Sequence, residues 1–381
     1  MAEASTATQE FQRRLGRYTT GRPGPTIVVC GGLHGNEPAG ALAARRVLER
    51  LERERPPLRG ELLAVAGNLA ALAAGRRYLA VDLNRVWQPD HVLSVRNGGS
   101  RSPEQEELRA LLEVFDGLDD RDGPRILLDL HTTSGESPPF TIMSDTLRNR
   151  RIAFALPPTV ILGLEETVDG TLLEYLTERG HTAVVVEAGQ HDAPASVAIH
   201  EAVLWMGLTA AGALTPREVP YFAAHRARLH EASRDQPRVV ELRHRHPVDA
   251  SDGFRMEPGY RGLQPVAQGE LLGRDRGGEV RAPQRGRIVL PLYQELGDDG
   301  FYLVRRVSRV WLGLSVLLRR LKLGRIVPWL PGVEKHPDQP NALLVDPKVA
   351  RWLGVEIFHL FGFRRRRPDG DHLVFSRRRP G

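Results

Sequence analysis

The feature that most constrains this chain is a glycine-rich segment, residues 31–38, which directly follows a short apolar run at residues 26–30. The run reads Thr-Ile-Val-Val-Cys and predicts a buried strand. The segment after it carries His34 and Glu37. An open α/β sheet places its chemistry just beyond the carboxyl ends of its strands. Imidazole and carboxylate groups are also ligands of catalytic zinc sites. The segment therefore predicts an α/β fold with part of a metal site at a strand end.

Strand-like runs alternate with helix-like segments from this point to residue 216. Such alternation predicts an α/β domain with a mixed, mostly parallel sheet flanked by helices on both faces. The expected strands are residues 26–30, 61–68, 125–130, 158–163 and 183–186, and the expected helices are residues 38–55, 102–115, 170–179 and 194–213. Residues 78–85 and 90–101 are expected to be extended or loop segments because they are polar or contain glycine.

The pattern changes after residue 216, and we divide the chain accordingly. Residues 1–23 are a polar lead-in, and residues 24–216 form the α/β catalytic domain. Short runs rich in Val, Leu and Gly, separated by turns, predict a second, β-rich domain at residues 217–309. Residues 310–381 form a basic C-terminal extension of unknown role.

The extension begins with an apolar stretch at residues 310–318, which is about half the length of a membrane span. We expect this stretch to be a packed helix, and the alternative is an anchor that lies on a membrane surface. Arginines cluster at residues 364–367 and 377–379, within a chain of net charge +6. Such clusters attract anionic partners. The sequence nevertheless disfavours nucleic acid as the partner, because it contains no recognisable nucleic-acid-binding module.

The composition and the N-terminal residues indicate in which cellular compartment the protein is expected. No apolar run reaches the length of a membrane span, so we expect no membrane partner. Residues 1–12 lack the basic and then apolar layout of a signal peptide. The single cysteine, Cys30, excludes an internal disulfide and suits a reducing compartment. We expect a cytoplasmic protein in which Cys30 is a small buried hydrophobic residue. The oligomeric state stays open.

A second histidine, His131, ends the apolar run at residues 125–130. Together with His34 and Glu37 it forms a set of two histidines and one glutamate. Zinc held by such a set keeps a fourth position for water and lowers the pKa of that water. Because both segments follow strands of one α/β domain, we predict one zinc ion per chain at these three residues.

Glu187 follows a run of valines at residues 184–186 and precedes Gly189. This position is expected at the mouth of the same sheet. The functional interpretation is a general base that takes a proton from water and delivers it to a leaving nitrogen, and the simpler alternative is an ordinary loop carboxylate. His191 lies four residues after Glu187 and is a candidate for lining the same pocket.

Two short segments offer positive charge to this pocket. Residues 76–77 are both arginine, and residues 82–85 read Asp-Leu-Asn-Arg. A fixed guanidinium stabilises the oxyanion of a tetrahedral intermediate. An arginine beside an asparagine also grips a carboxylate through hydrogen bonds. The residue types alone do not show which segment stabilises an oxyanion and which binds a carboxylate.

In their order along the chain, these motifs resemble the succinylglutamate desuccinylase/aspartoacylase family. The resemblance rests on His-Gly-Asn-Glu at residues 34–37, Asp-Leu-Asn-Arg at 82–85, Asp-Leu-His at 129–131 and the strand that ends in Glu187, and it extends over roughly residues 25–310. Members of the family are zinc hydrolases with the fold of the zinc carboxypeptidases. The resemblance therefore implies a zinc-carboxypeptidase-like fold here.

The resemblance also implies roles for the candidate residues. Zinc would be held by the two histidines and the glutamate already described, and Glu187 would be the general acid and base. Arg77 would polarise the scissile carbonyl, whereas Asn84 and Arg85 would hold the carboxylate of the substrate. The family has a further substrate-binding arginine upstream of its catalytic glutamate, and the nearest arginine here, Arg179, stands at a different offset.

A further departure lies in the β-rich domain. In aspartoacylase a tyrosine of this domain reaches into the site, but the matching place here holds Leu290, and Tyr293 is shifted. The resemblance therefore leaves the acyl group and the amino acid of the substrate open.

The sequence thus predicts a zinc-dependent amidohydrolase that cleaves an N-acyl amino acid, or a similar small amide bearing a carboxylate, with metal-activated water. One alternative is a zinc carboxypeptidase acting on peptide C-termini, which would use the same carboxylate clamp. An alternative from another class is a binding protein that uses the arginine-rich C-terminus. The expected partner is a small-molecule N-acyl amino acid.

Overall fold

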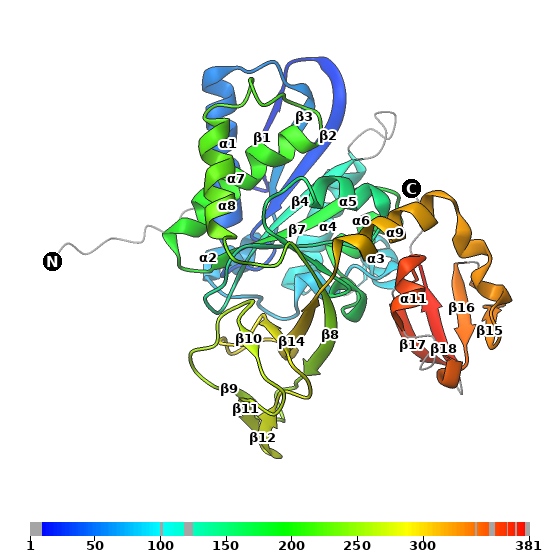
Figure 1. Cartoon of the computed structure of the whole chain (residues 1–381). Coiled ribbons are helices and arrows are strands. Elements are labelled where there is room, and N and C mark those ends of the chain that lie inside the picture. The colour runs from blue at the N-terminus through cyan, green and yellow to red at the C-terminus, as the bar shows by residue number, and fades with distance from the viewer. Residues whose placement is uncertain are drawn as a thin grey trace.

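The computed structural model describes residues 10–99, 102–117, 125–339, 341–349, 355–363, 365–369 and 372–377. Within them the largest element is an 11-stranded sheet (Figure 1). In spatial order its strands are β1 (Arg14–Thr19), β3 (Arg59–Ala66), β2 (Arg22–Gly31), β4 (Ile126–Thr133), β7 (Thr182–Gln190), β5 (Phe140–Ile142), β6 (Thr159–Leu162), β8 (Val239–Pro247), β14 (Asp299–Arg306), β13 (Gly286–Val289) and β10 (Pro265–Val266).

The sheet is mixed. Its strands are mostly parallel in the part that belongs to the expected catalytic domain. Between β1 and β8, five of the seven pairings are parallel, and only β1 with β3 and β5 with β7 are antiparallel. Beyond β8 the three remaining pairings are all antiparallel. This arrangement confirms the predicted α/β fold class.

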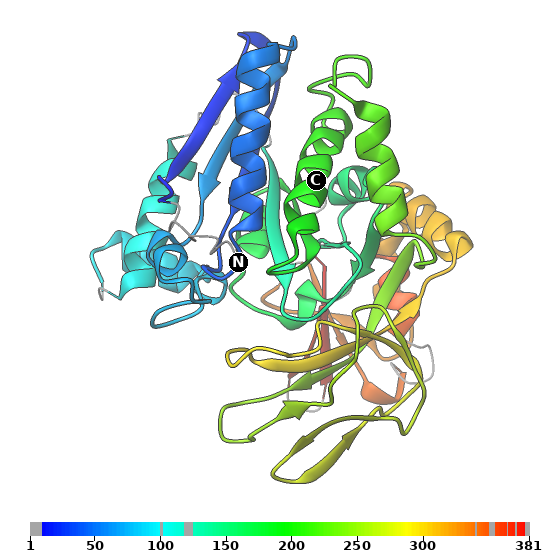
Figure 2. The ribbon, with the colours of Figure 1, turned by 90° about the vertical axis from the view of Figure 1, so that its left-hand side faces the viewer.

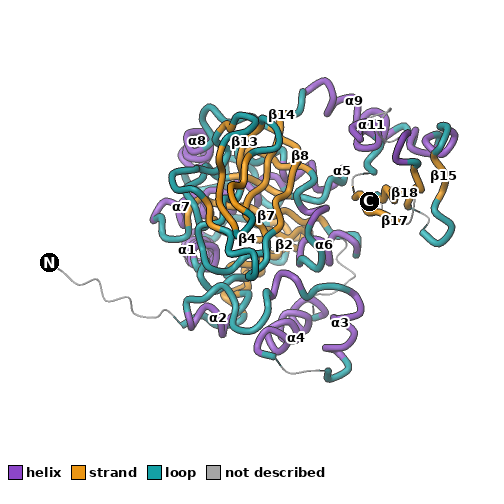
Figure 3. Tube along the Cα trace, turned by 90° about the horizontal axis from the view of Figure 1, so that it is seen from below, coloured by secondary structure: helices purple, strands orange, loops and turns teal. Residues whose placement is uncertain are grey.

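Helices cover both faces of the parallel part (Figures 1 and 3). One face packs against α1 (Ala39–Glu54), α5 (Leu147–Ala153), α7 (Pro194–Ala210) and α8 (Phe222–Ala232), and the other packs against α3 (Pro89–Arg96), α4 (Pro103–Asp116) and α6 (Leu172–Glu178). Successive side chains of a strand point to opposite faces. In β2, Ile27 and Val29 therefore enter the first core, while Val28 and Cys30 enter the second. Two buried faces explain why the parallel strands read as continuous apolar runs.

Each strand and helix predicted between residues 26 and 213 is present, with ends displaced by a few residues. The start of α4 agrees with the sequence in detail, because Ser102 and Gln105 form a capping box and Pro103 is the first helical residue. Cys30 is fully buried, as expected, and its thiol is free. Burial, together with the charge of the adjacent Asp129, raises the pKa of this thiol well above its usual value.

One expectation was wrong. The segment at residues 90–101 was expected to be a loop, but α3 occupies its first part and buries Val92 and Val95. Because α3 has only eight residues and buries two of them, its pattern of apolar residues is too short to be recognised as a helix from the sequence. The lead-in at residues 1–23 contains β1 and the start of β2. Since β1 is an edge strand in which only Tyr18 is buried, its sequence is polar.

The β-rich region continues the large sheet through β8, β14, β13 and β10. A separate three-stranded sheet is formed by β9 (Arg255–Met256), β11 (Leu271–Asp275) and β12 (Gly278–Arg281). Figure 2 shows this region below the parallel part of the sheet. The division of the chain at residues 216 and 309 stays a prediction, because one sheet passes through both expected domains.

The C-terminal extension contains a small fold that the sequence did not predict. Its helices and turns are α9 (Arg309–Arg320), η4 (Leu323–Arg325), η5 (Val327–Trp329) and α11 (Val355–Leu360), and its sheet has the order β15 (Val333–Lys335), β16 (Ala342–Val345), β18 (His372–Ser376) and β17 (Arg365–Asp369). The two arginine clusters fall partly outside the described residues, at 364 and 378–379. Among the described helices, none combines the length and apolar character that crossing a bilayer requires.

Candidate active site

Three neighbouring parallel strands bring the candidate site residues together. His34 follows β2, His131 lies near the end of β4, and Glu187 lies near the end of β7. The register pairs Gly31 with Leu130 and His131 with Glu187. The strand ends therefore lie side by side at one edge of the sheet, where α/β proteins bind their ligands.

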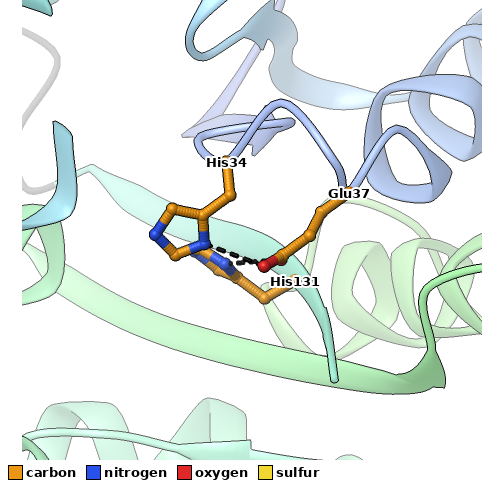
Figure 4. Close-up of side chains that lie close together, drawn as sticks. All are labelled: His34, Glu37 and His131. Carbon is orange, nitrogen blue, oxygen red and sulfur yellow. Dashed lines mark hydrogen bonds and ion pairs between the residues drawn. The ribbon is translucent and has the colours of Figure 1, made fainter. Parts of the chain in front are cut away.

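The two histidines converge on one carboxylate (Figure 4). Glu37 Oε1 lies 2.9 Å from Nδ1 of His34, and Glu37 Oε2 lies 3.0 Å from Nδ1 of His131. One ligand atom from each residue falls within 4.8 Å of the others. All three side chains are buried. The structure thus brings together the three predicted ligands in a group that could hold a metal ion.

Two aspartates fix the far sides of the imidazole rings. Nε2 of His34 lies 3.0 Å from Asp82 Oδ1, and Nε2 of His131 lies 3.2 Å from Asp129 Oδ2. A carboxylate behind a histidine orients the ring and increases its basicity as a ligand. With Nε2 engaged in this way, each Nδ1 faces the centre of the group. Both aspartates belong to motifs of the sequence, at residues 82–85 and 129–131, but the motifs alone give neither residue a role.

The charges of the group stabilise one another against the cost of burial. Burial disfavours ionised Glu37, but His34 and His131 outweigh it and hold the pKa of Glu37 well below its usual value. Burial likewise opposes a charge on His131, but Asp129 and Glu37 raise the pKa of His131 well above its usual value. Asp82 is kept ionised, since His34 and Arg77 lower its pKa despite burial.

Glu187 differs from these paired carboxylates. It is buried, and its Oε2 makes no hydrogen bond within the described part of the chain. Burial is the main cause that raises the pKa of Glu187 to about 8, and the negative charge of Glu37 adds to it. A carboxyl group with such a pKa is suited to exchanging a proton near neutral pH.

Arg77 lines the same pocket as Glu187 and is held by two acidic residues. Its Nη2 donates to Asp82 Oδ2 at 2.9 Å, and its Nη1 lies 3.7 Å from Glu37 Oε1. Burial opposes its charge, but Asp82 and Glu37 outweigh that cost and raise the pKa of Arg77. The guanidinium is therefore a fixed positive charge that lines the pocket.

Asn84 and Arg85 lie on η1 (Leu83–Arg85), whose start is capped by the Asp82 side chain. Oδ1 of Asn84 accepts a hydrogen bond from the backbone N–H of Leu172 at 3.0 Å, which ties η1 to the start of α6. Nε of Arg85 lies 3.5 Å from Asp298 Oδ2. Both side chains line the same pocket as the histidines.

His191 also lines this pocket, beside the β-rich region. Its Nδ1 lies 2.7 Å from Thr132 Oγ1, and its Nε2 lies 3.3 Å from Gln294 Oε1. Gln294 also accepts a hydrogen bond from Asn36 Nδ2 at 3.2 Å. The sequence gave no signal for Gln294, because it belongs to a loop more than 100 residues away from His191.

The β-rich region forms one wall of the pocket. Its contribution comes from the loop that precedes β14 and from β14 itself, and comprises Leu290, Leu292, Gln294, Gly297, Asp298, Asp299 and Tyr302. The α/β part lines the rest of the pocket with the aliphatic residues Ile142, Leu164, Val168, Leu173 and Val185 and with the buried Glu165. The sequence gave no signal that these residues line a pocket, and only Val185 lies in a segment that was singled out, the run before Glu187.

The structure shows where the residues lie at which the sequence departs from the family pattern. Leu290 lines the pocket, with a positive φ of 51°. Tyr293 directs its hydroxyl away from the pocket, where it donates to the Glu257 carbonyl and accepts from the Tyr260 N–H. Arg179 lies over the ring of Tyr175 at 3.5 Å and is absent from the described lining of the pocket.

A buried His-Glu-His group lies beside a buried carboxylate and a fixed guanidinium at the strand ends of an α/β sheet, and this combination of groups is typical of hydrolases. Comparison with known proteins narrows this class to hydrolases of amide bonds. Residues 23–203 match the family model of the succinylglutamate desuccinylase/aspartoacylase catalytic domain. This match covers the α/β part of the chain, which carries the candidate site.

Individual relatives agree with this match. A succinylglutamate desuccinylase from Burkholderia thailandensis is 28% identical over 288 residues, which cover 70% of this chain and 75% of the relative. Among solved structures, a succinylglutamate desuccinylase/aspartoacylase from Rhodobacter sphaeroides matches with a TM-score of 0.55 and 20% identity, over 75% of this chain and 87% of that one. A product-bound ectoine utilization protein from Ruegeria pomeroyi matches with a TM-score of 0.53 and 21% identity, over 76% and 87%. These two structures share the fold.

Proposed function

We propose that the protein is a zinc-dependent amidohydrolase that removes the acyl group from an N-acyl amino acid. The observation that carries this proposal is the convergence of His34, Glu37 and His131 within 4.8 Å in a buried pocket that also contains Glu187 and Arg77.

The donor atoms fit zinc. Two imidazole nitrogens and one carboxylate oxygen form a ligand set of catalytic zinc sites. His34 and His131 both present Nδ1, because Asp82 and Asp129 engage the other nitrogen of each ring. When bound, zinc polarises a carbonyl group and lowers the pKa of water, which is the chemistry that amide hydrolysis needs.

Glu187 is the proposed general acid and base. It takes a proton from the attacking water and gives it to the nitrogen of the leaving amine. Its burial, its pKa of about 8 and its free Oε2 support this role, since the group is ready both to accept and to release a proton. Arg77 is proposed to stabilise the oxyanion of the tetrahedral intermediate, because its charge is fixed by Asp82 before substrate arrives.

Asn84 and Arg85 are proposed to bind the carboxylate of the amino acid. Nδ2 of Asn84 and the guanidinium of Arg85 are both hydrogen-bond donors, and both side chains line the pocket. In the free protein Arg85 lies beside Asp298, and substrate would replace that partner. His191 is proposed to position substrate from the other side of the pocket.

The wall supplied by the β-rich region favours a small substrate over a peptide. His191 and Asn36 of the α/β part both contact Gln294, and Ser134 hydrogen-bonds with Pro291 and Tyr293. These contacts hold the wall against the site. A peptide chain leaving the pocket on this side would have to break them, whereas a short acyl group would not. This observation favours an amidohydrolase over a carboxypeptidase.

The test is a substrate screen with the zinc-loaded protein. We expect hydrolysis of one or more N-acetyl or N-succinyl amino acids and little release of C-terminal residues from short peptides, followed by assay of the free amine. The reverse preference would favour the carboxypeptidase alternative. Removal of zinc with a chelator should abolish the activity, and added zinc should restore it.

Zinc content gives an independent check of the ligand set. His131→Ala should lower the zinc bound per chain, as measured by elemental analysis, because it removes one of three ligands. His230→Ala is the matched control, since His230 is an exposed histidine on α8. Equal zinc content in the two variants would remove His131 from the proposed site.

A further inference from the structure

Exposed apolar side chains gather on one part of the C-terminal extension. Of the eleven large apolar side chains that are exposed within the described residues, six lie between Val310 and Trp329. These six are Val310, Leu314, Leu317, Leu321, Ile326 and Trp329. We call residues 309–329 the 309–329 surface. Scattered exposed apolar residues are ordinary, but a cluster of this kind marks a site of interaction.

Four of the six residues form a single stripe. Val310, Leu314, Leu317 and Leu321 are separated by four, three and four positions, which places them on one face along α9 and its C-terminal cap. Val310 is 82% exposed and Leu317 is 54% exposed. The stripe therefore faces away from the rest of the molecule.

The opposite side of α9 is attached to the protein. Ser315 is buried, and its hydroxyl donates to the Leu360 carbonyl at 2.9 Å. Nη2 of Arg319 donates to Asp145 Oδ2 at 2.8 Å. Because these polar contacts fix the rotation of the helix about its axis, the apolar stripe cannot turn inward without breaking them. The expectation of a packed helix thus holds for one side of α9 only.

The charged residues within the 309–329 surface are all positive. Residues 309–333 contain no aspartate or glutamate. The exposed cations of the 309–329 surface are Arg309, Arg320, Lys322 and Arg325. Trp329, at its far end, is 84% exposed. Figure 3 shows α9 at the outer edge of the molecule.

We propose that the 309–329 surface docks on an anionic lipid bilayer. An amphipathic helix with an apolar stripe and flanking cations binds in the plane of the membrane interface, where apolar side chains enter the acyl boundary and cations meet lipid phosphates. Tryptophan is enriched at this depth. A second copy of the same surface would bring like charges together, and nucleic acid would leave the stripe in water. The proposal is independent of the hydrolase site and revises the expectation of no membrane partner, which rested on the lack of a spanning segment.

Vesicle co-sedimentation of the full-length protein tests the proposal. We expect binding to vesicles that contain phosphatidylcholine and phosphatidylserine, much weaker binding to phosphatidylcholine alone, and release from the anionic vesicles by high salt. Leu314→Glu/Leu317→Glu should abolish binding. Lys322→Glu/Arg325→Glu should lower the partition coefficient by about tenfold or more, since each cation near an anionic surface adds to affinity.

Matched controls test whether vesicle binding depends on the 309–329 surface or on exposed charged and apolar side chains in general. Leu93→Glu alters a side chain that is 58% exposed on α3, and Arg217→Glu/Arg226→Glu reverses two exposed cations outside the extension. Both controls should bind vesicles like the unaltered protein. Circular dichroism of each variant checks that it is folded.

Three results would overturn the proposal. The first is a lack of binding to anionic vesicles at low salt. The second is equal loss of binding in the control variants. The third is a dimer in solution that Leu314→Glu/Leu317→Glu converts to monomer while the unaltered protein ignores vesicles, because the surface would then be an interface between copies of this chain.

Discussion

At the ends of β2, β4 and β7, charged side chains are buried, whereas on the 309–329 surface apolar side chains are exposed. Each arrangement is unfavourable unless a partner compensates for it. In the pocket the partners lie within the protein, because Asp82, Asp129 and Arg77 each pair with a charged group of the site. On α9 no described residue of the chain covers the stripe. The buried charges of the pocket are thus largely stabilised by one another, whereas the exposed stripe is where the proposed lipid partner would act.

Glu187 is buried in the pocket with an Oε2 that makes no hydrogen bond to the described part of the protein, and its substitution should have the largest effect. Glu187→Gln should lower kcat by about a thousandfold, because the amide can neither accept the proton of water nor donate one to the amine. Zinc content should stay unchanged, since Glu187 is outside the ligand set. Steady-state kinetics on an identified substrate, together with elemental analysis, measures both.

The control for this variant is Glu113→Gln, which alters an exposed carboxylate on α4. It should retain full activity. If Glu187→Gln hydrolysed the substrate at the rate of this control, the general acid and base would have to be another residue.

Two leucine-to-alanine substitutions compare how much a side chain contributes to stability in the interior near the pocket and on the 309–329 surface. Leu33 is fully buried beside His34, so Leu33→Ala should lower the free energy of unfolding by about 3 kcal/mol. Leu317→Ala on α9 should change it by less than about 0.5 kcal/mol, because the side chain is already in water. Urea unfolding in the absence of lipid measures both values. A large loss of stability for Leu317→Ala would mean that the stripe is packed within the protein.

The aspartates behind the histidines should have a smaller effect on the pocket. Asp82→Asn should weaken zinc binding roughly 10- to 100-fold, because His34 loses its charged partner while the direct ligands stay in place. Competition with a zinc-binding dye measures the affinity. Asp338→Asn, at an exposed position of the extension, is the matched control. Identical zinc affinities in the two variants would show that Asp82 stabilises Arg77 but does not contribute to zinc binding.

The site and the surface also differed in how far the sequence could predict them. His34, Glu37, His131 and Glu187 stood out because each follows an apolar run, and the strand ends meet at one edge of the sheet. The walls of the pocket could not be predicted in this way. Gln294 reaches His191 only because the β-rich region folds back over the sheet. On α9 the sequence showed an apolar stretch, but which side of the helix packs depended on Ser315 and Arg319 meeting partners far away in the chain.

The sequence by itself determined the α/β alternation, the motifs at the strand ends and the resemblance to a family of hydrolases, because these are local patterns of periodicity and residue type. Only the tertiary structure decided which nitrogen of each histidine faces the site, that Glu187 is buried without a partner for its Oε2, and that the apolar stripe of α9 is exposed. The physical reason is distance along the chain. The pairs His34–Asp82 and Glu37–His131 are separated by 48 and 94 residues, and such contacts exist only once strands lie side by side.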